Sequence, residues 1–311
     1  MTEVLPNTDL HHIVPSLREK SFYEPTTERS INWVAYSQAQ INDVVETLDF
    51  IRDRVDETEY LPMPGKVGRH LTDPKILAKA ILLAEFLGSP ERPAQGWTRV
   101  LGPAVGIFTM IDDRVLGEAY DNIEVLHILK QVFEQNKTSD GQLSGDGTGL
   151  ETTRKQNYET KKETGASLTS IVDSREIVQA FDAGGTQECK AMHELIKFVT
   201  GKSLRLDAGF IDRELTKEIV MRGMTPFIFP KKNTLINGHS SWKKMYLSLL
   251  DDVLTWLREY HQRSHSESFH SSFKRKNAPV RKRRPTARLS QITARIILHN
   301  RRRIDYFNRQ N

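Results

Sequence analysis

The 311-residue sequence has one cysteine, Cys189. A single cysteine excludes an internal disulfide and suits a reducing, cytoplasmic compartment. The sequence also lacks a long apolar run, since residues 76–87 are interrupted by Lys79 and Glu85. This run falls short of the roughly 20 apolar residues of a membrane helix. The first twelve residues have no basic segment leading into an apolar one, so neither a secretory signal nor a membrane partner is expected.

What the sequence does contain describes a globular chain. Hydrophobic residues make up 38% and charged residues 27%, and the mean hydropathy is -0.51. This composition excludes a disordered polyampholyte. At roughly 100 to 200 residues per domain, the length allows one large or two modest domains with a real core.

The net charge of +5 is unevenly distributed. Residues 274–311 hold 13 Lys and Arg against one acid, whereas residues 1–273 hold 32 bases and 39 acids. An acidic body with a basic end is typical of proteins that bind phosphate, because a cationic cluster releases counterions from nucleic acid. The alternative is a basic end that only confers solubility. Apolar positions from Leu289 to Ile297 predict that part of this end packs on the preceding domain, with its arginines facing outward.

The pattern of residues predicts four regions. Residues 1–36 form an irregular arm, and residues 37–138 form a helical region that is the candidate for DNA binding. Residues 139–276 form a mixed α/β domain, and residues 277–311 form a basic C-terminal extension. Apolar spacings of three and four predict helices over residues 37–56, 72–88, 93–101 and 112–136.

Short β-like runs begin after the Gly- and Ser-rich segment at residue 139. The predicted order is three strands, then a helix, strand, helix and strand, and finally a long helix from Ser241. Strands that alternate with helices after an opening meander predict an α/β fold with a mixed sheet flanked by helices.

Three acids are notable for their positions. Asp146 lies between two glycines in the first predicted strand, where the lack of a Cβ leaves room for a ligand or a second chain. Asp207 follows the strand at 203–206, and ligands of open α/β sheets gather beyond the carboxyl ends of strands. Glu267 lies on the last predicted helix. Singly, each is better explained as a turn, cap or surface acid. Together, the three are suited to hold Mg²⁺.

Ligands for a softer metal are fewer. Cys189 and His193 are four residues apart and could share a helix face, as could His261 and His265. Without a third and a fourth convergent ligand, we interpret them as ordinary surface or core residues. Asp212 stands where a helix should begin and is interpreted as an N-cap.

The last predicted helix has an apolar stripe that becomes polar. The stripe ends at Tyr260, and Arg263, Glu267 and Lys274 then lie within an arc of roughly 60° if the helix continues at about 100° per residue. Such a face enters a polar site, or else belongs to a helix that leaves the core for solvent.

These residues resemble a known family. The spacing Tyr260-x2-Arg263-x3-Glu267-x6-Lys274 is similar to the Y-R-E-K signature of insertion-sequence DDE transposases, and the segments around Asp146 and Asp207 resemble that family's two aspartate blocks. The resemblance covers about residues 140–276. It implies a ribonuclease-H-like fold in which Asp146, Asp207 and Glu267 are catalytic and hold two Mg²⁺ or Mn²⁺ ions.

The resemblance also implies a function and its partners. It implies a prokaryotic, nucleoid-associated enzyme that binds terminal inverted repeats and catalyses DNA cleavage and strand transfer. A homodimer on the paired transposon ends is expected by the same resemblance. The residues expected to contact double-stranded DNA are Tyr260, Arg263, Lys274, Arg275, Lys276, Arg281, Lys282, Arg283 and Arg284. Two alternatives remain open: a non-enzymatic DNA-binding remnant of a transposase, and a ribonuclease-H-like nuclease without strand transfer.

Overall fold

The structure is a computed structural model that describes residues 10, 14, 15, 17, 32–60, 72–153, 165–185 and 187–310. The arm predicted over residues 1–36 lies almost wholly outside the described residues. The elements of the helical region are α2 (Trp33–Asp56), α3 (Pro74–Phe86), α4 (Glu91–Leu101), the 3₁₀ turn η2 (Gly102–Val105), α5 (Asp113–Ala119) and α6 (Ile123–Gln135). The prediction that this region is all helical is confirmed.

Two boundaries in the helical region differ from the prediction. Helix α2 begins earlier than Ser37, because the side chain of Asn32 accepts a hydrogen bond from the Ala35 amide at 3.0 Å and caps the helix there. The helix predicted over residues 112–136 is two helices. The side chain of Asn122 accepts a hydrogen bond from the Glu124 amide at 2.8 Å and starts α6 anew.

The remaining elements alternate as predicted. They are β1 (Gln142–Leu150), β2 (Ala166–Val172), β3 (Val178–Asp182), α7 (Glu188–Leu195), η3 (Ile196–Phe198), β4 (Ser203–Leu206), η4 (Ala208–Phe210), α8 (Arg213–Met221), β5 (Thr225–Ile228), α9 (Ser240–Asp251), α10 (Val253–His261), α11 (Ser264–Lys276) and α12 (Pro285–Asn308). The long helix predicted from Ser241 is wrong, because three helices occupy its place. The side chain of Asp252 accepts a hydrogen bond from the Thr255 amide at 3.0 Å and so separates α10 from α9.

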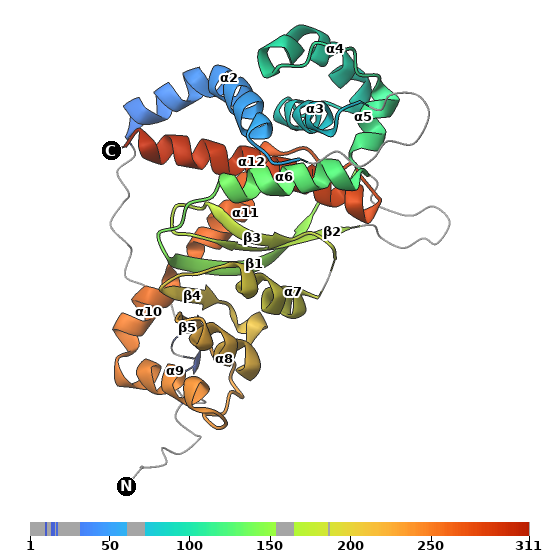
Figure 1. Cartoon of the computed structure of the whole chain (residues 1–311). Coiled ribbons are helices and arrows are strands. Elements are labelled where there is room, and N and C mark those ends of the chain that lie inside the picture. Colours follow the sequence, from blue (N-terminus) through green and yellow to red (C-terminus); the bar gives the residue numbers. More distant parts are fainter. Residues whose placement is uncertain are drawn as a thin grey trace.

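The five strands form one mixed sheet in the order β3-β2-β1-β4-β5 (Figure 1). Strands β1, β2 and β3 form an antiparallel meander, whereas β4 and β5 are parallel to β1. This confirms the predicted fold class, a ribonuclease-H-like mixed sheet flanked by helices and preceded by an all-helical region.

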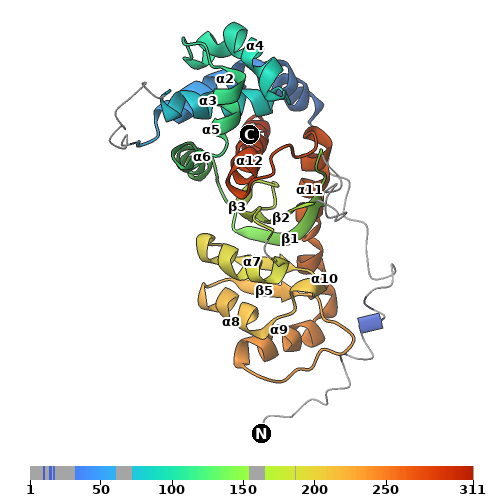
Figure 2. The ribbon, with the colours of Figure 1, turned by 90° about the vertical axis from the view of Figure 1, so that its right-hand side faces the viewer.

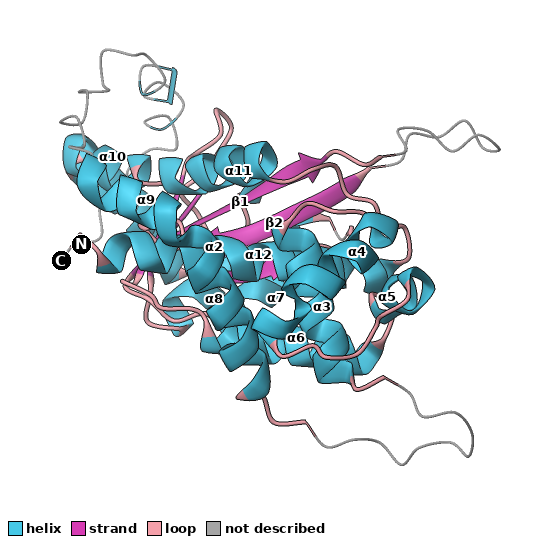
Figure 3. Ribbon diagram, turned by 90° about the horizontal axis from the view of Figure 1, so that it is seen from above, coloured by secondary structure: helices cyan, strands magenta, loops and turns pink. Residues whose placement is uncertain are grey.

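The sheet separates two hydrophobic cores. Leu168 and Val172 of β2 face a cluster that includes α3, α6 and α12, whereas Ile171 of the same strand faces a cluster with α7, α9 and α10. This alternation is the period of two that a strand buried on both faces requires. Figure 2 shows the resulting layers, and Figure 3 shows the helical side lying over the strands.

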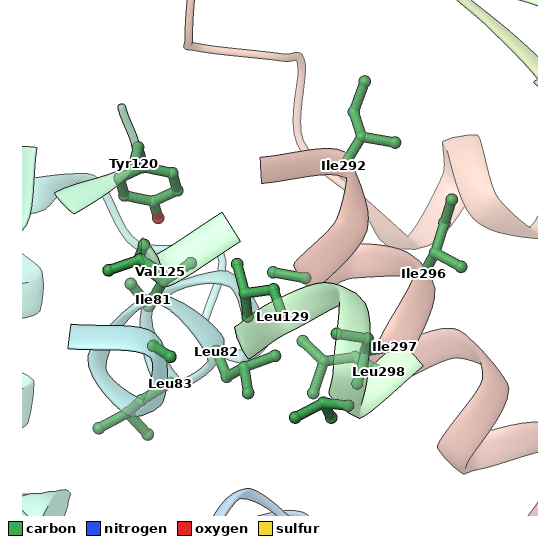
Figure 4. Packing of buried hydrophobic residues seen from close by; sticks show 14 of the residues in the cluster. Ile81, Leu82, Leu83, Tyr120, Val125, Leu129, Ile292, Ile296, Ile297 and Leu298 are labelled. Atoms are coloured by element: carbon green, nitrogen blue, oxygen red, sulfur yellow. The ribbon is translucent and has the colours of Figure 1, made fainter. Parts of the chain in front are cut away.

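The basic C-terminal segment is part of the first core. Helix α12 packs against α6, α3 and α2, and its side chains Ile292, Ile296, Ile297 and Leu298 are buried with those of the earlier helices (Figure 4). Part of this segment was therefore correctly predicted to pack, but its main partners are the N-terminal helices. The expectation that its arginines face outward is wrong for Arg295 and Arg301, whose side chains are 3% and 4% exposed.

One buried and one partly buried acid neutralise these buried arginines. The side chain of Arg295 donates a hydrogen bond to Glu85 at 2.6 Å, and that of Arg301 donates to Asp43 at 2.5 Å. Glu85 also accepts hydrogen bonds from Tyr120 at 2.7 Å and Arg281 at 2.7 Å. Charges that are buried must be paired or they destabilise the fold, so part of the terminal positive charge is used within the protein.

Among the described residues, no helix combines the length with the apolar composition that crossing a membrane requires.

Candidate active site

Two of the three predicted carboxylates, Asp146 and Asp207, lie side by side on neighbouring strands. Strands β1 and β4 are parallel, and Gly145 is the partner of Leu206. The next residues along the two strands are Asp146 and Asp207. Asp146 therefore lies within β1, and Asp207 lies at the carboxyl end of β4 beside it. The side chain of Asp207 accepts a hydrogen bond from the Gly209 amide at 2.7 Å, which fixes one of its oxygens.

The glycines on either side of Asp146 make room for helix α7. A Cβ at Gly145 would lie 2.8 Å from Cε of Met192, and one at Gly147 would lie 2.4 Å from the carboxylate of Glu188. The expected reason for these glycines, the approach of a ligand or second chain, is thus replaced by the close packing of α7 against β1. Asp146 alternates with the two glycines and faces the other side of the sheet, toward α11.

Arg263 connects two of the three carboxylates. Its guanidinium lies 3.7 Å from Oδ2 of Asp146 and forms an ion pair with Glu267. Arg263 is also the N-cap residue of α11, and Glu267 lies in the first turn of that helix. Glu267 is half-exposed, at 55%, whereas Asp146 is 19% exposed. The cluster therefore has an enclosed side at the sheet and an open side at α11.

The four signature residues do not lie on one continuous helix. Tyr260 belongs to α10, and the chain leaves the helix at Gln262 before α11 begins. The predicted arc of 60° therefore does not apply across this junction. Arg263 still contacts both parts, because its guanidinium lies over the Tyr260 ring at 6.0 Å from the centroid and pairs with Glu267. The Tyr260 ring itself stacks on Trp256 at 5.5 Å.

A histidine that the sequence reasoning missed joins this cluster. His270 is buried on α11, and its Nδ1 lies 3.8 Å from Oδ2 of Asp146. Its Nε2 is hydrogen-bonded with the Ser170 hydroxyl at 3.0 Å. The position of His270, three residues after Glu267 on a helix, is the signal that could have identified it. Burial lowers the pKa of the His270 imidazole to about 4, so the ring is neutral at pH 7.

The electrostatics of the cluster favour a bound cation. The pKa of the Asp146 carboxyl is raised to about 6, chiefly because the side chain is buried. The negative charges of Asp207 and Glu267 act in the same direction, whereas the Gly147 amide and the Arg263 guanidinium oppose them. Carboxylate oxygens are the ligands that Mg²⁺ prefers. The three carboxylates, whose negative charge Arg263 neutralises only in part, thus fit a hard divalent cation.

The three predicted DNA-binding residues on α11 are all exposed. Lys274 is exposed and lies close enough to His270 to lower the pKa of that imidazole. Arg275 is also exposed. Lys276 is exposed as well, and it lines a cavity of about 750 Å³ between α2 and α12, which none of the three carboxylates lines.

The predicted DNA-binding run at residues 281–284 divides into two pairs. Arg281 and Lys282 have side chains that are each 13% exposed, and they pair with Glu85 and Glu91. Arg283 and Arg284 are exposed. Only the second pair presents its charge to solvent.

One comparison with known proteins returned a match. A family model described as "Transposase DDE domain" matches residues 138–301, which is more than half of the chain. No curated protein and no solved structure matches the chain. The matched residues include the five strands, the three carboxylates and most of α12.

Proposed function

The chain belongs to the transposase DDE-domain family, and on that premise we propose that it is an insertion-sequence transposase of the Y-R-E-K subgroup. It binds the terminal inverted repeats of its element, cleaves the DNA there and transfers the freed strand to a target. The observation that carries the proposal is the position of Asp146 and Asp207 at one level of neighbouring parallel strands, with Arg263 joining Asp146 to Glu267.

Asp146, Asp207 and Glu267 are the proposed catalytic residues and metal ligands. Together they hold two Mg²⁺ or Mn²⁺ ions. Such ions, when bound, activate the attacking oxygen and stabilise the leaving oxygen of a phosphodiester displacement. The raised pKa of Asp146, which reflects a buried carboxyl beside two other acids, supports a cation at this position.

The remaining signature residues position the carboxylates and the DNA. Arg263 orients Glu267 through their ion pair, and the ring of Tyr260 packs against the guanidinium of Arg263. Lys274 and Arg275 on the exposed face of α11 bind phosphates of the transposon end, with each charge contributing to affinity rather than to sequence choice. No nucleophilic side chain is required, because water and then a DNA 3′-hydroxyl attack.

The other regions have separate roles in this proposal. The helical region at 37–138 binds DNA, the domain at 139–276 performs the chemistry, and the exposed Arg283 and Arg284 of the segment at 277–311 add phosphate contacts. The buried bases of that segment, Arg281 and Lys282, contribute to folding. Two copies of the chain pair the two transposon ends, and both act on nucleoid DNA in a prokaryotic cytoplasm.

The decisive experiment uses DNA with the inverted repeats that flank the gene. The full-length protein is incubated with this DNA and Mg²⁺, with Asp207→Asn as the inactive control. Cleavage at the repeat by the wild type alone supports the proposal, and joined products establish strand transfer. Cleavage without joining identifies a simple nuclease. DNA binding without cleavage by the wild type identifies a non-enzymatic remnant.

A further inference from the structure

A second group of metal-binding side chains lies where α7 meets the start of α8. Cys189 and His193 are one turn apart on α7, and Asp212 is the residue that caps α8. The Cys189 sulfur, a ring nitrogen of His193 and a carboxylate oxygen of Asp212 all lie within 4.8 Å of one another. This group uses none of the three carboxylates assigned to catalysis. Asp212 supplies the third ligand that was missing from the sequence pattern.

The separation between His193 and Asp212 is close to that of two ligands on one ion. Nε2 of His193 lies 3.7 Å from Oδ2 of Asp212, too far for a good hydrogen bond. Zinc binds nitrogen and oxygen at about 2.0 to 2.2 Å, so a nitrogen and an oxygen on one tetrahedral ion lie about 3.3 to 3.5 Å apart. The observed separation exceeds that range by about 0.2 Å, which a small rotation of either side chain removes.

The imidazole of His193 has an outer partner of the kind seen at metal sites. Nδ1 of His193 is hydrogen-bonded with Oε2 of Glu218 at 2.9 Å. A carboxylate on one ring nitrogen holds the proton there and leaves the lone pair of the other nitrogen free for a metal. Here the free nitrogen is Nε2, the one that faces Asp212.

Asp212 can bind a metal without giving up its structural role. Its Oδ1 accepts a hydrogen bond from the Leu215 amide at 3.0 Å, which caps α8. Its Oδ2 is the oxygen that faces His193. The side chains of His193 and Asp212 are 24% and 37% exposed, so an ion has a path from solvent.

We propose that Cys189, His193 and Asp212 bind one Zn²⁺ ion, with Glu218 as the outer partner of His193 and a water as the fourth ligand. A thiolate and an imidazole select zinc over Mg²⁺, which prefers oxygen ligands. Binding requires that the Cys189 thiol release its proton to solvent. The ion links α7 to the segment that follows Asp207, and it thereby limits the movement of that segment beside the proposed catalytic carboxylates.

Cobalt provides a direct test, because Co²⁺ replaces Zn²⁺ and gives an absorption band when a thiolate binds it. The chain has one cysteine, so any such band must come from Cys189. We expect the full-length protein to show the band at one equivalent of Co²⁺ and to lose it when Zn²⁺ is added. Absence of the band in the wild type would overturn the proposal.

Substitutions that keep the local structure identify the ligands. Cys189→Ser should abolish the band. His193→Gln and Asp212→Asn should weaken or abolish it. These two variants keep the local contacts, because glutamine can still donate to Glu218 and asparagine can still cap α8. Glu218→Gln should lower zinc affinity about 10- to 100-fold, as expected for an outer partner. An unchanged band in both His193→Gln and Asp212→Asn would show that Cys189 binds cobalt alone, which would also overturn the proposal.

Two controls separate this site from the proposed catalytic cluster. Asp207→Asn should keep the cobalt band, and His127→Gln, at an exposed histidine on α6, should leave the band and the zinc affinity unchanged. Zinc should raise Tm of the wild type but not of Cys189→Ser, while the two have similar Tm values in EDTA. The cobalt band and Tm therefore test the zinc site, whereas DNA cleavage tests the transposase activity, and either proposal can fail without the other.

Discussion

Glu85 and Arg295 form a buried ion pair, with 2.6 Å between Oε2 and Nε, across 210 residues of sequence. It joins α3 of the helical region to α12 at the end of the chain. The pair is one of several contacts through which the basic C-terminal segment and the acidic body neutralise each other's charge. The predictions below begin with this pair.

Removal of Arg295 should strongly destabilise the protein. Arg295→Ala leaves buried Glu85 with Arg281 but without the second of these two arginine partners. Breaking a buried pair costs about 3 to 5 kcal/mol, and the retained Arg281 places the expected loss at the lower end of that range. Arg284→Ala is the matched control, because Arg284 pairs with Asp121 while 80% exposed, and such pairs contribute little. The measurement is the free energy of unfolding in urea. Equal losses for the two variants would contradict the buried pair's importance.

His299 should make stability depend on pH. Burial lowers the pKa of this imidazole to about 3, and its Nε2 is hydrogen-bonded with the Glu176 carbonyl oxygen at 2.8 Å. The unfolded chain takes up a proton near pH 6.5, so the stabilising contribution is present above that pH and is lost as pH falls toward 3. Between pH 7.5 and 5, the loss due to this group should be about 2 kcal/mol.

His299→Gln should remove that part of the pH dependence, because glutamine donates to the same carbonyl without titrating. Urea unfolding at pH 7.5 and at pH 5 measures it. If both proteins lose the same free energy on acidification, His299 is not the responsible group.

Arg263 should matter for catalysis more than for DNA affinity. Arg263→Lys keeps the charge but loses the fork that reaches Asp146 and Glu267. Misplacement of a catalytic group by about 1 Å costs on the order of 100-fold in rate, so we expect that loss in single-turnover cleavage. The dissociation constant for the transposon end should change less than the rate. Arg258→Lys, at an exposed arginine of α10, serves as control.

Lys274 and Arg275 should determine part of the salt dependence of DNA binding. Each phosphate contact contributes about 0.9 to the slope of log affinity against log salt. Lys274→Ala and Arg275→Ala should each make the slope shallower by about that amount, with Tm unchanged. Lys244→Ala, on the exposed face of α9, should leave the slope as it is. A full slope in the double variant would place the DNA elsewhere.

Local patterns in the sequence were sufficient to predict the strands and the mixed character of the sheet. Alternation and turn residues located the strands, and the family resemblance selected Asp146 and Asp207, which the register then brings side by side. The helix breaks were harder to predict. Apolar spacing continues through Asp252, so periodicity alone hides a break that one side-chain hydrogen bond produces.

Ion pairs between residues far apart in the chain could not be predicted from the sequence. A charge count correctly identifies the basic C-terminal segment, but it does not distinguish Arg295, which meets Glu85, from Arg284, which faces solvent. That choice depends on which helix α12 packs against. Asp212 was correctly interpreted as an N-cap, and its second oxygen becomes visible as a possible ligand only when α7 is placed beside it.

The position of α12 also governs the order of folding during synthesis. The ribosome makes α2 to α6 before the sheet and α12, yet the core that these helices share with α12 stays open until α12 has emerged. Domains usually fold from the N-terminus as the chain is made. In this protein the core of the helical layer cannot be completed until the sheet and α12 have been synthesised. Until then, Glu85 lacks its partners Arg281 and Arg295. Helices α2 to α6, which are translated before the sheet, are thus completed only after it.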